Sequence, residues 1–313
     1  MNNSVLYAAV VLIWGSTWYA IGLQVESAGP GVSVFYRYVA AAALLLGWCL
    51  VSGRSLRFDG RAHLMFMGLG LTLFSINFVL VYAAEVTIGS ALTAVVFASL
   101  LWMNMLFARL LFGAKLDRRA IAGSIVGMFG LVVVCLPGLR AATFDDGTLY
   151  GVFLALAGTA IASAGNMLSQ HAQSVRIPVV QANAWGMLYG AGISGLAAWL
   201  LGEDFAVAIT APYLASLAYL VVFGSILGFG AYLTLLGRIG AHRAGYASVA
   251  FPVVAMILAV LLEGYTLDAT TIIGVLCVLC GNLLTLGRPG TRASRPSAAG
   301  RVSVRGRRLL PNR

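Results

Sequence analysis

The chain has 313 residues, of which 60% are hydrophobic and only 10% are charged, and its mean hydropathy is +0.93. Since about a quarter of the residues of a soluble domain are charged, this composition excludes a soluble globular protein and predicts an integral membrane protein. The net charge of +10 does not indicate nucleic-acid binding, because eight of the 20 basic residues follow Gly287 and most of the others lie in short loops.

Apolar segments of roughly 17–25 residues recur along the chain, and each is long enough to cross the hydrocarbon core of a bilayer as an α-helix. The connections between them leave no room for a soluble domain. The sequence therefore predicts an all-α membrane protein with ten transmembrane helices, at about residues 4–22, 32–51, 63–83, 88–112, 120–138, 148–171, 179–201, 212–236, 244–262 and 270–287.

Charged residues in the loops predict the orientation of these helices. Short cytoplasmic loops retain Lys and Arg, and here such residues gather in the loops after the second, fourth, sixth and eighth helices. The opposite loops carry mainly Asp and Glu. Both the N-terminus and the C-terminus are therefore expected in the cytoplasm, on the side that carries Arg54, Arg57, Arg61, Lys115, Arg118, Arg119, Arg176, Arg238 and Arg243.

Two stretches of the chain share one plan. Residues 88–117 and 239–268 both run from Ile-Gly through a long apolar span to Leu-Leu-x-Gly-x-x-Leu-Asp, at an offset of 151 residues. When the alignment is carried on to Gly130 and Gly281, 12 of 43 positions are identical, against about four or five expected by chance. Five helices per copy is an odd number, so the second copy would cross the bilayer in the opposite sense, as in the inverted repeats of secondary transporters.

The duplication predicts the domain organisation. We expect a first five-helix repeat over residues 1–140, a second over 141–287 and a tail over 288–313. The tail alternates Arg with Gly, Pro, Ser and Ala and has no apolar face, so we expect it to be disordered in the cytoplasm. An anchor at the anionic leaflet is a simpler role for it than a specific partner site.

No pattern for catalysis or ATP use is present. The sequence has no P-loop, GxSxG, HExxH or DDxxD motif and no nucleophile paired with a base inside a span, so we expect no enzymatic activity and no cofactor. The cysteines lie in or at the ends of apolar spans, without the histidines or second cysteine pair of a zinc site. We interpret them as packing residues and expect no metal; they are Cys49, Cys135, Cys277 and Cys280.

Polar and aromatic side chains at helical spacing indicate a candidate substrate site. On the sixth predicted helix, four polar residues follow at steps of four, three and four, and this stripe should face a cavity or another helix rather than lipid. Two other interpretations remain open: aromatic anchors at the membrane interface, and hydrogen bonds that only tie helices together. The predicted substrate-binding residues are Trp14, Thr17, Trp18, Tyr82, Thr93, Phe97, Thr159, Ser163, Asn166, Gln170, Phe229 and Tyr232.

A few further residues in or near the spans are unusual. Arg37 lies inside the second span, where it could extend to the interface as an anchor or bind a substrate carboxylate. Glu85 and Glu263 are expected at the outer ends of spans three and nine, where hydration makes a charge inexpensive. Pro252 removes a backbone donor from the ninth span and can kink it, so it is the predicted gating residue.

Several short motifs carry a family resemblance; in order they are Trp14-Gly15-Ser16-Thr17, Arg37, Tyr82-Ala83-Ala84, and Phe251-Pro252 through Glu263-Gly264-Tyr265 to Gly281-Asn282. Together with the five-plus-five duplication, they resemble the EamA family of the drug/metabolite transporter superfamily over about residues 4–287. The resemblance implies a ten-helix inverted-repeat carrier that typically exports amino acids and related metabolites. Its central pocket would draw mainly on helices one, three, four, six, eight and nine.

The chain departs from this family pattern in two places. Leu101 stands where the proline equivalent to Pro252 is expected. The frequent Gly-Glu at the end of the fourth and ninth spans is replaced by Gly113-Ala114 and Gly264-Tyr265, and Glu263 stands on the preceding side. No role is therefore transferred to that glutamate.

The sequence thus predicts a secondary transporter of the cell (inner) membrane that exports amino acids or similar small amphipathic metabolites by alternating access. The expected partners are a small-molecule substrate and the lipid bilayer, without nucleic acid. A drug or other metabolite carrier of the same superfamily is the alternative. From a different class, a non-transporting scaffold would not need a polar stripe, and an intramembrane enzyme would need a paired acid and base.

Overall fold

Every regular element that the structure describes is a helix, so the predicted all-α class is confirmed. The predicted tail over 288–313 lies outside the described residues. The computed structural model describes residues 2–113, 118–141, 147–207, 209–245 and 247–285. Its elements are α1 (Asn3–Val25), α2 (Pro30–Val51), α3 (Gly60–Leu73), α4 (Ile76–Phe97), α5 (Leu100–Phe112), α6 (Arg118–Ala141), α7 (Thr148–Ser174), α8 (Val179–Leu200), α9 (Ala211–Tyr219), the π-helix η1 (Leu220–Gly228), α10 (Phe229–Ile239), α11 (Ala241–Ala244), α12 (Ala247–Leu262) and α13 (Ala269–Thr285).

The helices are apolar over membrane-spanning lengths. Among the described residues, five helical stretches are long and apolar enough to cross a bilayer, at 3–25, 30–51, 60–97, 148–174 and 211–239. Shorter apolar helices cover residues 100–112, 121–130, 250–262 and 269–281. This distribution agrees with the membrane class that the composition predicts.

The third predicted span is divided in a way that the sequence did not indicate. The expected helix over 63–83 is interrupted at Phe74 and Ser75, between α3 and α4. α4 then continues past the predicted end of that span and contains a sharp turn at Gly89, with φ 73° and ψ 169°. The interruption lies against α8, where a Cβ added to Gly190 would lie 2.6 Å from the carbonyl oxygen of Phe74. Tertiary packing, and not a local helix breaker, therefore accompanies this break.

The duplicated stretches have matching backbone conformations. Gly89 and Gly240 stand 151 residues apart, and their φ angles are 73° and 86° with ψ angles of 169° and 153°. Gly113 and Gly264 stand at the same offset and have φ angles of 65° and 67°. Only glycine adopts such positive φ values without steric cost. The two copies therefore share their turns as well as their sequence pattern.

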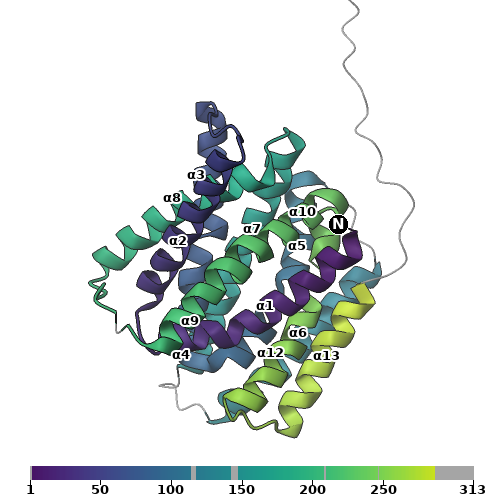
Figure 1. Cartoon of the computed structure of the whole chain (residues 1–313). Coiled ribbons are helices and arrows are strands. Elements are labelled where there is room, and N and C mark those ends of the chain that lie inside the picture. The colour runs from purple at the N-terminus through teal and green to yellow at the C-terminus, as the bar shows by residue number, and fades with distance from the viewer. Residues whose placement is uncertain (1, 114–117, 142–146, 208, 246, 286–313) are drawn as a thin grey trace, which may run out of the picture.

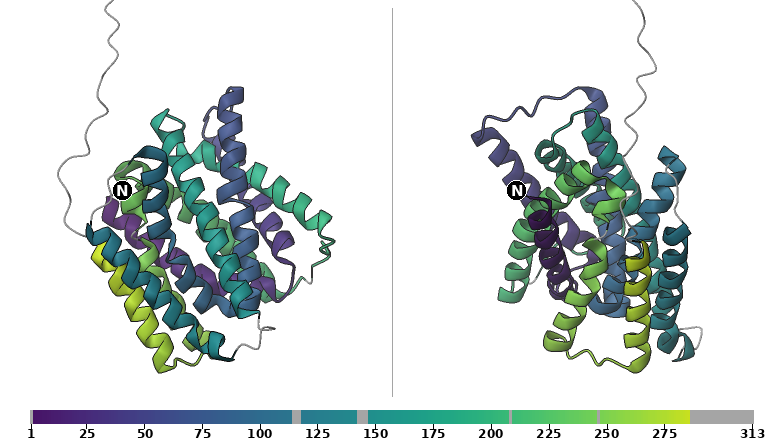
Figure 2. Two further views of the ribbon diagram at one scale, coloured as in Figure 1. Left: turned by 180° about the vertical axis from the view of Figure 1, so that it is seen from behind. Right: turned by 90° about the vertical axis from the view of Figure 1, so that its right-hand side faces the viewer.

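The helices α6 and α13, which end the two copies, run side by side in antiparallel directions and meet through glycines (Figure 2). A Cβ added to Gly130 would lie 2.7 Å from the carbonyl oxygen of Gly274, and one added to Gly281 would lie 2.5 Å from that of Gly123. Gly123 is equivalent to Gly274, and Gly130 to Gly281, at the 151-residue offset. Each copy thus offers the same two glycines to the other, which is the pattern of an approximate twofold axis.

Substitution of Gly130 by alanine is expected to separate α6 from α13. The added methyl group would collide with backbone atoms of α13, so the free energy of unfolding should fall by about 1–3 kcal/mol, as in other overpacked sites. Chemical denaturation of the purified protein in detergent measures this. The control is Gly47→Ala on α2, because nothing lies within 4 Å of a Cβ there, and equal stability of the two variants would contradict the close contact.

The remaining helices are arranged around two packed helix pairs. α2 and α8 pack together at one end of the molecule, α6 and α13 pack together at the other, and α1, α7 and α10 lie between them (Figure 1). Within the second copy, α9, η1 and α10 follow one another without a break. The middle of the molecule, where helices of both copies meet, is the place to look for a binding site.

Candidate functional site

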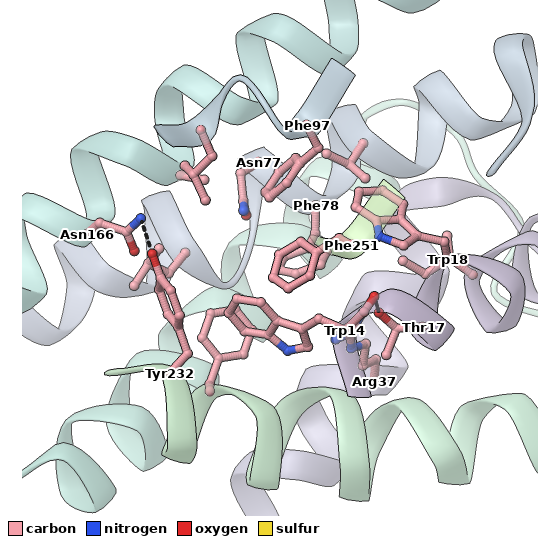
Figure 3. A pocket seen from close by; sticks show the side chains of 16 residues that line it. Trp14, Thr17, Trp18, Arg37, Asn77, Phe78, Phe97, Asn166, Tyr232 and Phe251 are labelled. Carbon is pink, nitrogen blue, oxygen red and sulfur yellow. Dashed lines mark hydrogen bonds between the residues drawn. The ribbon is translucent and has the colours of Figure 1, made fainter. Parts of the chain in front are cut away.

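A small cavity of about 40 Å³ lies between the helices of the two copies (Figure 3). The first copy contributes α1, α2, α3, α4 and α5 to the wall, and the second contributes α7, α10 and α12. The lining residues are Trp14, Thr17, Trp18, Ile21, Arg37, Leu73, Asn77, Phe78, Val81, Phe97, Leu100, Ala162, Asn166, Phe229, Tyr232 and Phe251.

Aromatic side chains form a large part of the wall. The ring of Trp14 lies 4.8 Å from that of Tyr232 and 4.9 Å from that of Phe229, measured between centroids. On the other side, Trp18 lies 5.4 Å from Phe97 in an edge-to-face arrangement. Rings at these distances attract one another and have few rotatable bonds, so they form a stiff apolar surface. Such a surface suits an apolar group of a ligand.

The π-helix η1 connects two of the lining residues to the second copy. Trp14 donates a hydrogen bond from Nε1 to the carbonyl oxygen of Gly224 at 3.0 Å. Arg37 donates from Nε to Oγ of Ser225 at 2.8 Å. Departures from α-helical geometry of this kind are frequent at functional sites. The acceptors of both hydrogen bonds therefore lie on a π-helical segment of the second copy.

Arg37 ends inside the protein and does not extend to the membrane interface. Its side chain is 1% exposed, and besides Ser225 it donates from Nη1 to the hydroxyl of Tyr82 at 3.2 Å. Its guanidinium carbon also lies 4.7 Å from the ring centroid of Phe78 and 5.2 Å from that of Tyr38. These contacts fix the cation beside the cavity. The interpretation of this residue as an interfacial anchor is therefore wrong.

A buried polar cluster joins α5, α7 and α10 at the edge of the cavity. Oδ1 of Asn104 accepts hydrogen bonds from Ser163 Oγ at 2.8 Å and from Asn166 Nδ2 at 3.2 Å. Asn166 Nδ2 also donates to the hydroxyl of Tyr232 at 3.0 Å (Figure 3). Because Asn166 and Tyr232 both line the cavity, the cluster fixes the orientation of two polar groups in the wall.

The predicted substrate-binding residues divide into two groups. Seven line the cavity, and these are Trp14, Thr17, Trp18, Phe97, Asn166, Phe229 and Tyr232. The other five do not line it and bond to the protein instead: Tyr82 accepts from Arg37, Thr93 and Thr159 donate to carbonyl oxygens of their own helices, Ser163 donates to Asn104, and Gln170 accepts from the backbone of Ala241. Pro252 is a buried residue within α12, next to the cavity-lining Phe251.

Sequence reasoning missed several lining residues, and four of them come from the interrupted third span. Leu73 ends α3, and Asn77, Phe78 and Val81 lie near the start of α4. One signal could have found Phe78, because it stands four residues before Tyr82 and so shares a helical face with it. The apolar residues among them carry no other mark that distinguishes a cavity wall from a core.

A second hollow, of about 570 Å³, lies near the C-terminal ends of α1 and α12 and beside the middle of α4, and is lined in part by Glu26, Glu85 and Glu263. Glu263 is exposed and accepts hydrogen bonds from Ser90 Oγ at 2.6 and 2.7 Å. Glu85 is buried, and both of its carboxylate oxygens lack a hydrogen-bond partner among the described residues. Glu85 therefore borders this hollow but is more deeply buried than a residue at a span end, because α4 extends past the predicted span end and packs against α1 and α12.

Comparison with protein families finds one match that covers most of the chain. The model of the EamA-like transporter family matches it twice, over residues 3–136 and 149–287. Among curated proteins, the chain is 30% identical over 284 residues to the "Uncharacterized inner membrane transporter YedA" of Escherichia coli K12, covering 90% of this chain and 89% of that protein.

Two further comparisons also cover most of the chain, one with a curated protein and one with a solved structure. The chain is 24% identical over 291 residues to the "Probable amino-acid metabolite efflux pump" of Escherichia coli K12, covering 90% of this chain and 93% of that protein. A solved crystal structure superposes with a TM-score of 0.67 at 19% identity, covering 90% of this chain and 95% of the other. At that identity the superposition shows a shared fold alone.

Proposed function

This chain belongs to the EamA-like transporter family, and on that premise we propose that it exports amino acids or similar small amphipathic metabolites. It is a transporter and not an enzyme. It is a multi-pass protein of the inner membrane, the location that the name of the relative YedA gives. The name of a second relative, an amino-acid metabolite efflux pump, supports both the substrate class and the direction of transport.

The same proposal includes the arrangement in the membrane. Ten transmembrane helices would form two inverted five-helix repeats, over 1–140 and 141–287, with both termini in the cytoplasm and the basic tail beside them. The glycine turns at a constant offset and the reciprocal contact of α6 with α13 support this arrangement. Transport would proceed by alternating access between the two repeats. Pro252, inside α12, is proposed as the gating residue.

The observation that carries the proposal is the aromatic cavity enclosed between the two copies. A carrier needs its binding site where the two moving halves meet, since a site inside one half would not change its access. The scaffold alternative gives no reason for an aromatic cavity at the place where the two copies meet. An aromatic wall suits an apolar drug as well as an apolar amino acid, and a flux measurement distinguishes the two.

Specific roles follow for the lining residues. Trp14, Trp18, Phe97 and Phe229 would hold an apolar side chain of the substrate, and Tyr232 would close the cavity at the polar cluster. Thr17 and Asn166 would supply hydrogen bonds. The predicted residues that lie behind the wall would position these groups; they are Tyr82, Thr93, Thr159, Ser163 and Gln170.

Flux measured with purified protein tests the proposal. Liposomes that contain the protein and are loaded with one of the twenty unlabelled amino acids should accumulate the same labelled amino acid by exchange, and protein-free liposomes should not. We expect exchange for amino acids with apolar side chains. The absence of exchange for all twenty, or exchange of the organic cation ethidium alone, would overturn the proposal and favour the drug-carrier alternative.

A further inference from the structure

The second hollow lies next to the central cavity, farther toward the C-terminal ends of α1 and α12. On α1, the lining of the cavity extends to Ile21 and that of the hollow to Glu26. On α12, Phe251 lines the cavity, whereas Leu262 and the following Glu263 line the hollow. The hollow has a volume of about 570 Å³, which falls in the usual range of pockets for small molecules. It therefore has room for an organic ligand of its own.

The described lining of this hollow carries three acidic groups and no basic one. Glu26 and Glu263 are exposed, and Glu85 is buried. None of the described lining residues is Lys, Arg or His. A cleft that is lined by charges of one sign concentrates their field, because the protein around it screens charge less than water does. The hollow therefore attracts cations.

Glu85 is an acceptor that the described chain leaves unused. Its side chain is 5% exposed, and neither of its carboxylate oxygens has a hydrogen-bond partner among the described residues. Arg37 acts on it electrostatically from the cavity but donates no hydrogen bond to it, and Glu263 acts on it with a charge of the same sign. Buried polar atoms are nearly always hydrogen-bonded, and a buried charge is normally paired. A cation in the hollow would relieve both deficits.

Glu263 brings a second carboxylate to the hollow from the other copy. Both of its oxygens accept from the one hydroxyl of Ser90, at 2.6 and 2.7 Å. A carboxylate has about four lone-pair positions, so a single hydroxyl hydrogen leaves most of this capacity available. Ser90 and Glu85 both belong to α4, and Glu263 follows the last residue of α12. The acceptors therefore come from both copies.

The rest of the lining favours an organic cation over a metal ion. Leu23, Val86 and Leu262 add apolar surface, and Tyr19 adds an aromatic ring. Hard metal ions are held by a close shell of about six or more oxygen ligands, and the described residues contain no group of three His, Cys, Asp or Glu side chains that could hold one. An ammonium group with an apolar substituent matches both the acidic and the apolar parts of the lining.

We propose that the second hollow is a binding site for an organic amine. Its ammonium group lies toward Glu85 and Glu263, and its apolar part lies against Leu23, Val86 and Leu262. The central cavity, with the cation Arg37 in its wall, does not offer such a site. The inference goes beyond the proposed function, because it assigns a second ligand to a second site. Only the place of this site on a transport path rests on that function.

Three ligands of similar size test the site on the purified full-length protein. They are phenethylamine, 2-phenylethanol, which has a hydroxyl in place of the ammonium group, and 3-phenylpropionate, which is an anion. Isothermal titration in a zwitterionic detergent measures each Kd, and titration into protein-free micelles is subtracted. We expect phenethylamine to bind about 10- to 100-fold more tightly than 2-phenylethanol, as for the gain of a charge-assisted hydrogen bond. Equal affinities, or tighter binding of 3-phenylpropionate, would overturn the proposal.

Glu263→Gln locates the binding in the second hollow. Glutamine keeps the size of the side chain and an acceptor for Ser90 but removes the negative charge. The Kd of phenethylamine should rise about tenfold, and that of 2-phenylethanol should not change. The control is Asp204→Asn, which removes an exposed carboxylate outside the hollow and should leave both affinities unchanged. An equal effect of the two variants would show a general attraction by surface charge and would contradict the site.

Glu85→Gln tests the buried acceptor in the same way. We expect it to weaken phenethylamine more than 2-phenylethanol. A purely structural role of Glu85 predicts instead a changed unfolding temperature with an unchanged ratio of the two affinities. If this variant does not fold, Glu263→Gln still decides, because Glu263 is exposed.

Two further measurements separate this site from other interpretations. Calcium chloride titrated at constant ionic strength should not displace phenethylamine; displacement that Glu263→Gln abolishes would assign a metal site and overturn the organic ligand. Exchange flux of amino acids on the same preparation judges the proposed function separately. Amino-acid exchange without amine binding would overturn this site alone, whereas amine binding without exchange of any amino acid would support the site and overturn the proposed function.

Discussion

Replacement of Trp14 by alanine is expected to weaken the binding of L-phenylalanine by about 10- to 100-fold, which corresponds to the loss of one well-buried aromatic contact. Trp14 contacts Phe229, Tyr232 and Phe251 with its ring and donates to Gly224 with its N–H. Alanine would therefore remove a side of the wall and the connection between α1 and η1 together. Titration of the purified variant measures the affinity, and exchange flux should fall in parallel.

Two controls separate these contributions of Trp14. Trp14→Phe keeps an aromatic ring and loses only the hydrogen bond to Gly224, so its affinity should fall by less than about tenfold. Trp48→Ala removes a tryptophan from α2 that is 58% exposed and should leave binding unchanged. Wild-type affinity in Trp14→Ala would contradict the placement of the substrate in this cavity.

Replacement of Asn104 by alanine is expected to have the largest effect on stability among single changes near the site. Its Oδ1 accepts from both Ser163 and Asn166, so the change leaves two buried donors short of an acceptor and opens a space in α5. Each unsatisfied buried group costs about 1–3 kcal/mol. Hydrogen bonds in membrane interiors often contribute less than the upper end of this range. We therefore expect the free energy of unfolding to fall by about 2–4 kcal/mol in total, as measured by chemical denaturation in detergent.

A double-mutant cycle isolates the contribution of this cluster. Ser163→Ala removes one of the donors that Asn104 satisfies, so the effect of Asn104→Ala should be smaller in that background. Thr159→Val is the control, because Thr159 donates only to the carbonyl oxygen of Ala155 in its own helix. Additive effects of Asn104→Ala and Ser163→Ala would contradict a shared network.

The positions of the helices follow largely from the sequence, whereas their interruptions do not. Hydropathy places most helices within a few residues, and the offset of 151 residues predicts which turns are equivalent. The break at Phe74 and Ser75 contains neither Pro nor Gly. It lies where the backbone at Phe74 approaches Gly190 of α8, so the packing that accompanies it involves residues more than a hundred positions away in the chain.

The polar stripe on α7 shows why residues of the site are harder to predict than helices. Helical spacing correctly identifies Thr159, Ser163 and Asn166 as one buried face. The spacing does not distinguish a face that borders a cavity from one that borders another helix. Thr159 bonds to its own backbone and Ser163 to α5, and of these three residues only Asn166 lines the cavity. Distinguishing these cases requires the positions of the neighbouring helices.

The paired glycines of α6 and α13 also bear on how such a chain could arise. Because Gly123 meets Gly281 and Gly130 meets Gly274, each copy supplies the same two residues to the contact. A half-length polypeptide with these two glycines could make the same contact with a second, identical polypeptide, as in any isologous dimer. Fusion of two such genes would keep the interface and free each half to diverge. Pro252 on one side and Leu101 on the other are an example of that divergence.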